Sequence, residues 1–319
     1  MKNTLKKLFI LFIALVCAFG AFASCKKSKR NFSVVCTVFP QYDWVKQILG
    51  DKIEDFDLVY LTDNGVDLHS YQPTVKDIAA ISSSDLFIYV GGESDEWTTS
   101  ALKNLANKNN KSLSLLSVCT LIEEEHDHDE EHADEEHDHE HEADEHVWTS
   151  IKNAIACVDK IAGLICDIDS ENAEYYKENA KKYVDKLSAL DARYTSELAA
   201  YKGRTLVFAD RFPFAYLFND YGLLYEAAFS GCSAESEASF EKIAHLAKKI
   251  DELNLSVLLV TDKGNTKLAD TVINQTKNKN ARIERLNSFQ SVKLSEAEEK
   301  VSYFSISESN LSVLLSALR

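Results

Sequence analysis

The 319-residue chain carries 35 lysine and arginine residues against 51 aspartate and glutamate residues, which gives a formal net charge of −16. The segment from Glu123 to His146 holds 15 of these acids and 7 of the 9 histidines, so the rest of the chain sums to only −1. With no basic patch beyond the N-terminal region, the composition excludes nucleic acid as an expected partner. At this length we expect two lobes, because a single hydrophobic core seldom serves so many residues.

The N-terminal residues have the composition of an export signal. Three lysines precede an apolar stretch over 8–22, and Cys25 follows two small residues. A basic start and a short apolar stretch are typical of a cleaved signal, and the stretch is short for a membrane span. We therefore expect a signal peptide over 1–24 and a tether over 25–31 with lipidation at Cys25, as in bacterial lipoproteins. The protein would then be anchored to the membrane in the periplasm or at the cell surface. Phe22 departs from the aliphatic residue usual in lipoprotein signals, and an ordinary signal peptide cut nearby is the alternative.

From residue 32 onwards, short β-rich runs alternate with amphipathic stretches. Their continuous apolar character predicts parallel sheets covered on both faces by helices. A helix is expected to begin at Pro40 and end near Gly50, and Thr74 with Asp77 predicts the capping box of another helix. The expected strands fall into two groups: 32–39, 57–61, 85–90 and 112–118, then 205–209, 256–260 and 281–286.

The middle of the chain, over 151–201, has no β-rich run. Apolar residues mark an amphipathic helix over 151–165, and after a break at 167–170 they recur every three or four positions over 176–201. This spacing predicts a helix of about 30 residues, about 45 Å long, that ends at Gly203. The expected fold class is therefore α/β: two lobes, each with a parallel-type sheet flanked by helices, joined by one long spanning helix. We assign the N-terminal lobe to 32–165, the linking helix to 166–203 and the C-terminal lobe to 204–319.

The acidic segment over 123–145 combines like charges with histidines. Blocks of like charge repel and bury no apolar surface, so we expect a disordered loop. Imidazole and carboxylate groups are ligands of first-row transition metals, zinc being the commonest. The loop is therefore expected to collect metal weakly, at several sites. Its histidines are His126, His128, His132, His137, His139 and His141.

Three blocks of residues occur in a distinctive order: DLHSYQPT over 67–74, DEHVW over 144–148 and YLFNDYGL over 216–223. Together with GESDEW over 92–97, the long central helix and the tail over 303–318, they resemble the zinc/manganese solute-binding lipoproteins of bacterial ABC importers. In that family the first two blocks run roughly D-P-H-x-Y-x-P-T and D-P-H-x-W. An acidic, histidine-rich loop commonly precedes the second histidine in zinc-specific members. The resemblance covers nearly the whole chain after the signal.

The resemblance implies one metal ion in a cleft between two lobes, bound by His69 and His146, which match family ligands residue for residue. The third ligand of the family, a histidine or glutamate, falls on Arg211, which stays protonated and cannot coordinate a cation. The neighbouring Asp210 is our candidate instead, and Arg211 could pair with an acid. The fourth ligand, an acid, falls near Asn287. Further candidates are Cys232, Glu235, Glu237 and Asp262.

The function implied is that of an extracytoplasmic receptor. It would capture Zn²⁺ and deliver it, as a monomer, to the permease and ATPase of an ABC importer. Manganese is the alternative metal, because carboxylates suit it well. A surface metal buffer or adhesin that uses mainly the histidine-rich loop is the other alternative, since Arg211 and Asn287 depart from the family. An enzyme is not expected, because the chain has neither H-E-x-x-H nor G-x-S-x-G. Metal affinity is expected to fall below about pH 6, since histidine must be neutral to bind.

A few residues are expected to have other roles. Glu145 adjoins His146 and is expected to face away from the metal. Five cysteines would remain in the exported chain besides the lipidated one, an odd number that leaves at least one thiol unpaired. Cys157 and Cys166 are expected to be buried as small apolar residues. His245 is expected to be a surface or packing residue.

Overall fold

The computed structural model of the chain describes residues 31–122, 143–229, 231 and 238–319. The expected signal peptide and Cys25 lie outside the described residues, as do the six histidines of the acidic loop and Cys232, Glu235 and Glu237. Among the described helices, none combines the length and the apolar character needed to cross a membrane.

The described strands form two sheets of four strands each. The first sheet has the order β2-β1-β3-β4 and the second the order β6-β5-β7-β8. Neighbouring strands are parallel throughout both sheets, as the sequence predicts. The strands are β1 (Phe32–Cys36), β2 (Phe56–Tyr60), β3 (Leu86–Tyr89), β4 (Lys111–Ser114), β5 (Thr205–Arg211), β6 (Leu224–Phe229), β7 (Val257–Thr261) and β8 (Arg282–Leu286). Seven of them match predicted strands, whereas β6 was not expected from the sequence.

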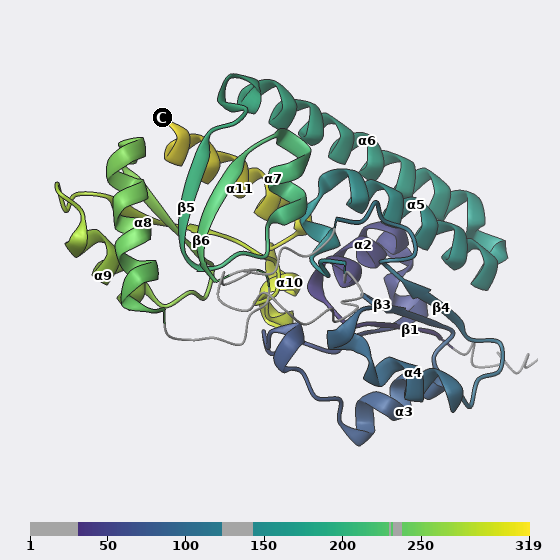
Figure 1. Cartoon of the computed structure of the whole chain (residues 1–319). Helices are drawn as coiled ribbons and strands as arrows, with labels where there is room; N and C mark the ends of the chain where they lie inside the picture. The colour runs from purple at the N-terminus through teal and green to yellow at the C-terminus, as the bar shows by residue number, and fades with distance from the viewer. Residues whose placement is uncertain (1–30, 123–142, 230, 232–237) are drawn as a thin grey trace, which may run out of the picture. The chain divides into compact units, whose positions relative to one another are not determined.

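Helices cover both faces of each sheet (Figure 1). In β1, Val34 and Cys36 join one hydrophobic core while Val35 joins another with Ile81 and Ala101 of the covering helices. Successive side chains of a strand point to opposite faces, so apolar residues in sequence supply two cores at once. The helices are α2 (Phe39–Leu49), α3 (Val75–Ser83), α4 (Trp97–Lys103), α5 (Ile151–Ile168), α6 (Ala173–Leu198), α7 (Ala215–Tyr221), α8 (Phe240–Leu253), α9 (Thr266–Gln275), α10 (Leu294–Glu299) and α11 (Tyr303–Leu318).

The predicted long helix is α6, which has 26 residues and continues into a short 3₁₀ turn. It packs along α5 (Figure 1). The hydroxyl of Tyr183 donates to Asp43 of α2 at 3.2 Å, and the hydroxyl of Tyr194 donates to the carbonyl of Ser307 in α11 at 2.6 Å. One helix therefore binds elements of both lobes, which confirms the predicted fold class. Its buried stripe consists of Tyr176, Ala180, Tyr183, Leu187, Leu190, Tyr194 and Leu198.

Candidate metal centre

His69 lies in the connection between β2 and α3. Asp67 caps the 3₁₀ turn Leu68–Ser70, and its carboxylate accepts a hydrogen bond from the backbone N–H of His69 at 3.0 Å. A few residues later, Thr74 and Asp77 form the predicted capping box of α3. The turn and the capped helix fix the backbone on both sides of the histidine. Its side chain is 17 % exposed, so one edge of the ring remains open to solvent.

His146 directly precedes the buried 3₁₀ turn Val147–Thr149. Its ring meets the ring of Trp148 edge-on with centroids 5.3 Å apart, and the Trp148 indole donates to the carbonyl of Ser288 at 2.9 Å. Asp144 Oδ1 accepts from the backbone N–H of His146 at 2.7 Å and lies 3.0 Å from His146 Nδ1. Because a carboxylate only accepts hydrogen bonds, Nδ1 carries the proton and Nε2 keeps its lone pair.

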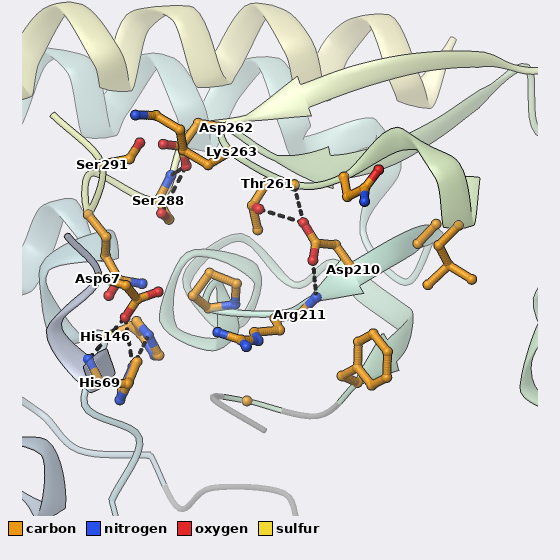
Figure 2. A pocket seen from close by; sticks show the side chains of 18 of the residues that line it. Asp67, His69, His146, Asp210, Arg211, Thr261, Asp262, Lys263, Ser288 and Ser291 are labelled. Atoms are coloured by element: carbon orange, nitrogen blue, oxygen red, sulfur yellow. Dashed lines mark hydrogen bonds and ion pairs between the residues drawn. The ribbon is translucent and has the colours of Figure 1, made fainter. Parts of the chain in front are cut away.

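The two histidines lie next to each other on one side of the pocket (Figure 2). Their Nε2 atoms lie 3.3 Å apart, although 77 residues separate them in the sequence. Two nitrogens bound at about 2.0–2.1 Å to one tetrahedral zinc ion lie about 3.3–3.4 Å from each other. The spacing of the pair is therefore that of two ligands of a single ion.

Both ligand blocks share a short pattern, an aspartate two residues before the histidine. Asp67 and Asp144 each accept a hydrogen bond from the backbone N–H of their histidine. They differ in their relation to the ring, because Asp144 also binds Nδ1 of His146 whereas Asp67 lies 3.9 Å from Nε2 of His69. The Asp-x-His repeat is thus the sequence signal for the two supporting carboxylates.

Glu145 lies beside the outer nitrogen of His69, in keeping with the expectation that it faces away from the metal. Its Oε2 is 3.7 Å from His69 Nδ1, and its Oε1 accepts from the backbone N–H of Ser94 at 2.8 Å. The Ser94 hydroxyl is hydrogen-bonded to the same Nδ1. Gly92 makes room for this carboxylate, because a Cβ at that position would overlap it. The outer nitrogen of each histidine is therefore occupied, and the two Nε2 atoms face each other at the pocket wall.

Electrostatics keep the site ready for a cation. Burial lowers the pKa of His69 to about 4, and the charges of His146 and Arg211 act in the same direction. Burial alone would raise the pKa of Asp144, but the charge and hydrogen bonds of His146 outweigh burial and lower it. These pKa shifts favour a neutral imidazole on His69 and an ionised carboxylate on Asp144, which are the protonation states that metal binding requires.

The lowered pKa of His69 predicts that its ring stays neutral well below the pH at which an exposed histidine titrates. Protons compete with a metal ion for an imidazole only near and below the pKa of that imidazole. We therefore expect acid to protonate His69 near pH 4 and not near 6.5, the value of an unperturbed histidine. NMR titration of the metal-free protein, with signals assigned through His69→Gln, measures this directly. A midpoint near 6.5 for His69 would contradict it and restore the expectation drawn from the unperturbed value.

The second sheet contributes the other side of a pocket of about 700 Å³. Asp210 and Arg211 stand at the end of β5, and Thr261 and Asp262 at the end of β7, all of them lining the pocket with the two histidines. Ligands of parallel α/β sheets bind beyond the carboxyl ends of the strands. The pocket lies at these ends of both sheets.

The Asp210 carboxylate is turned toward β7 (Figure 2). Its Oδ2 accepts from the backbone N–H of Thr261 at 3.1 Å and from the Thr261 hydroxyl, and its Oδ1 accepts from the backbone N–H of Arg211 at 2.9 Å. Within the described part of the chain, no three histidine, cysteine or acidic side chains are grouped to hold a metal ion. The structure thus brings His69 and His146 together and leaves Asp210 apart from them.

The remaining positions singled out by the sequence differ in their surroundings. Arg211 lines the pocket, whereas the Asn287 side chain accepts from a backbone N–H two residues on, at 2.8 Å. Asp262 also lines the pocket. Its Oδ1 accepts from the backbone N–H and the hydroxyl of Ser288, and its buried Oδ2 has no hydrogen-bond partner among the residues that the structure describes. His245 is half-exposed on α8 and pairs with Glu226 at 3.0 Å, which confirms its surface role.

The family model described as the periplasmic component A of zinc-uptake complexes matches residues 34–317. The chain belongs to this family. Membership confirms the resemblance drawn from the three sequence blocks. It also places the chain among solute-binding receptors rather than enzymes, as the sequence predicts.

Relatives within the zinc-uptake family span most of the chain. The high-affinity zinc uptake system protein ZnuA of Bacillus subtilis is 32 % identical over 322 residues, with 98 % of each chain covered. The zinc-binding lipoprotein AdcA of Streptococcus pneumoniae is 30 % identical over 317 residues, which cover 97 % of this chain and 60 % of AdcA.

Solved structures show the same fold. The metal-dependent lipoprotein YcdH of Bacillus subtilis superposes with a TM-score of 0.74 at 29 % identity, covering 90 % of this chain and 99 % of YcdH. The Zn(II)-bound ZnuA-like domain of Streptococcus pneumoniae AdcA gives a TM-score of 0.72 at 26 % identity, with 90 % and 99 % covered. These neighbours confirm the two parallel-sheet lobes.

Proposed function

We propose that the chain captures Zn²⁺ between its two lobes and hands the ion to the permease and ATPase of an ABC importer. The observation that carries the proposal is the pair of Nε2 atoms 3.3 Å apart on His69 and His146, each ring held at its outer nitrogen. Imidazole ligands favour zinc over manganese. The names of the relatives, zinc uptake for ZnuA and zinc binding for AdcA, point to the same cargo.

The oxygen ligands are proposed to come from the second lobe. Asp210 is the first candidate, and it would exchange a hydrogen bond from Thr261 for the metal. Asp262 is the second, because its Oδ2 is uncommitted among the described residues. Gly231 and Ala238, which flank the candidates Cys232, Glu235 and Glu237, both line the pocket. A zinc ion held by two histidines needs two more ligands to complete a tetrahedron. Asp210, Asp262 and the three candidates over 232–237 are the side chains of the second lobe that we propose to test.

The remaining parts of the proposal concern location. Export on the signal over 1–24 and lipid attachment at Cys25 would hold a monomeric receptor beside its permease. The lobes would be 32–165 and 204–319, joined by the helical segment 166–203. Several of the family's names fit this arrangement, since they include a periplasmic component and lipoproteins.

Calorimetric titration of residues 26–319 with zinc and with manganese tests the proposed function. We expect one tight zinc equivalent above a weak background from the histidine-rich segment, and weaker binding of manganese. Several weak equivalents without a tight one would favour the metal-buffer alternative. A tight manganese site with weaker zinc binding would instead make the chain a manganese receptor.

The histidine-rich segment is proposed to raise the local zinc concentration beside His146. Asp144 N–H donates to the carbonyl of Ile122 at 3.0 Å, so the two ends of the segment adjoin and a short Gly-Ser linker can replace 123–142. We expect this replacement to leave the affinity of the tight site unchanged and to slow its loading at scarce zinc. Stopped-flow measurement with a zinc-responsive dye reports the loading rate. Equal rates for both proteins would refute the proposed role.

A further inference from the structure

Two cysteines of the first lobe lie in contact, away from the metal pocket. The Sγ atoms of Cys119 and Cys157 are 3.5 Å apart, although 38 residues separate them in the sequence. Cys157 is fully buried on α5, and Cys119 is partly exposed in the turn that follows β4. Neither thiol has a role in the proposed metal site, so the pair needs an explanation of its own.

The backbone around this pair is already held in place. The backbone N–H of Thr120 donates to the side-chain carbonyl of Asn153 at 3.0 Å, and the Asn153 amide donates back to the Thr120 carbonyl at 3.2 Å. Asn153 stands one helical turn before Cys157 on α5, so the reciprocal bonds keep Cys119 beside that helix. A disulfide has its sulfurs about 2.05 Å apart, and an approach of about 1.5 Å by the side chain in the turn would close the gap.

We propose that Cys119 and Cys157 form a disulfide in the exported protein. The oxidant is a second disulfide, such as oxidised glutathione or a thiol–disulfide oxidoreductase. The Cys119 thiolate attacks one sulfur of the oxidant and releases the first thiolate, giving a mixed disulfide. The Cys157 thiolate then attacks Sγ of Cys119 and releases the second thiolate. The two protons of the cysteines end on the two thiols of the reduced oxidant, so the protein loses two electrons and two protons.

The exposure of the two thiols sets the order of these steps. Cys119 is the one that a bulky oxidant can reach. The hydrogen bond with Cys119 and burial both raise the pKa of Cys157, which makes it the slower, resolving thiol.

The disulfide would secure the segment on which a metal-supporting carboxylate rests. The backbone N–H of Ile122 donates to the Tyr216 hydroxyl at 3.2 Å, and that hydroxyl donates to the Asp144 carbonyl at 2.7 Å. Cys119 precedes this network by three residues. The covalent loop from 119 to 157 would include the histidine-rich segment and His146 in sequence. The link would stabilise the lobe by restricting the unfolded chain. It would leave the zinc ligands unchanged, because neither cysteine is one of them.

Tryptic mapping of the full chain, alkylated in denaturant and digested without reductant, tests the proposal. Cys119 and Cys157 fall in the consecutive tryptic peptides 112–152 and 153–160. After equilibration in a glutathione buffer as oxidising as the cell envelope, we expect these two peptides to be joined and to separate on reduction. The oxidised protein should also melt about 5 °C or more above the reduced protein.

Two serine variants complete the experiment. Cys157→Ser should leave the Cys119 peptide alkylated and abolish the difference in melting temperature between oxidised and reduced protein, whatever its effect on stability itself. Cys166→Ser, at a buried cysteine of the same helix, should keep both the linked peptides and the difference. Alkylation of both peptides in the oxidised wild-type protein would overturn the proposal, as would a link from Cys119 to any other cysteine. Zinc titration of the oxidised and reduced forms tests the proposed function independently of the disulfide, since both forms should bind zinc equally.

Discussion

Replacing His69 and His146 together by alanine is expected to abolish tight zinc binding. Structural zinc sites with four ligands contribute about 10–16 kcal/mol, so each ligand accounts for about 3 kcal/mol, or more than 100-fold in affinity. Each single variant should therefore bind zinc about 100-fold more weakly, and the double variant should retain only the weak background. Calorimetry in competition with a chelator of known affinity measures these losses.

The matched control is His245→Ala, which removes a half-exposed histidine outside the pocket. It should bind zinc like the wild type. His146 is buried and supports Asp144, so the melting curve of metal-free His146→Ala is needed to separate loss of a ligand from loss of the fold. His69 is partly exposed and its variant is less affected by this ambiguity. A tight site that survives in the double variant would place the metal elsewhere and defeat the proposed function.

The backbone architecture follows closely from the sequence because each signal is local. The stripe of α6 repeats every three or four residues, and the apolar runs of seven strands are continuous. The exception, β6, is an edge strand. Its last two residues are buried, its first residue, Leu224, is exposed, and the charged Glu226 lies between them. Its pattern is too mixed to distinguish from a loop, and its place in the sheet depends on pairing with β5.

The site depends more on three-dimensional context. His69 and His146 follow β2 and β4, the two edge strands of the first sheet, so their meeting depends on the course of the long connections after these strands and not on strand pairing. Their role was therefore predicted from a family resemblance and not from spacing. The contact of Glu145 with His69 was not predicted, because this residue lies in an irregular bend and its partner is distant in the sequence. The bond from Thr261 to Asp210 joins neighbouring strands, and no local pattern predicts it.

Asp144→Asn is expected to weaken zinc binding about 10–100-fold, although Asp144 does not face the metal. Asparagine preserves the size of the side chain but removes the charge that faces Nδ1 of His146 at 3.0 Å. Its amide can donate to Nδ1, which would move the ring proton to Nε2 and cover the lone pair that binds zinc. The variant therefore changes the tautomer of a ligand, and the loss of affinity follows from that change.

The matched control is Asp67→Asn, at the other aspartate of the Asp-x-His repeat. Asp67 accepts from the backbone N–H of His69 but makes no bond to its ring Nδ1, which Ser94 and Glu145 occupy instead. Its replacement should cost less than tenfold, because the ring tautomer is left alone. Nitrogen NMR shifts of His146 in the metal-free proteins report the tautomer and would not respond to a merely structural change. If Asp144→Asn leaves those shifts unchanged, or if both variants lose affinity equally, then the Asp144 carboxylate does not orient the ligand. A shift of the ring proton to Nε2 in Asp144→Asn alone would show that Asp144 sets the tautomer of its histidine. Asp67, in the same Asp-x-His pattern, would then only shape the turn that carries His69.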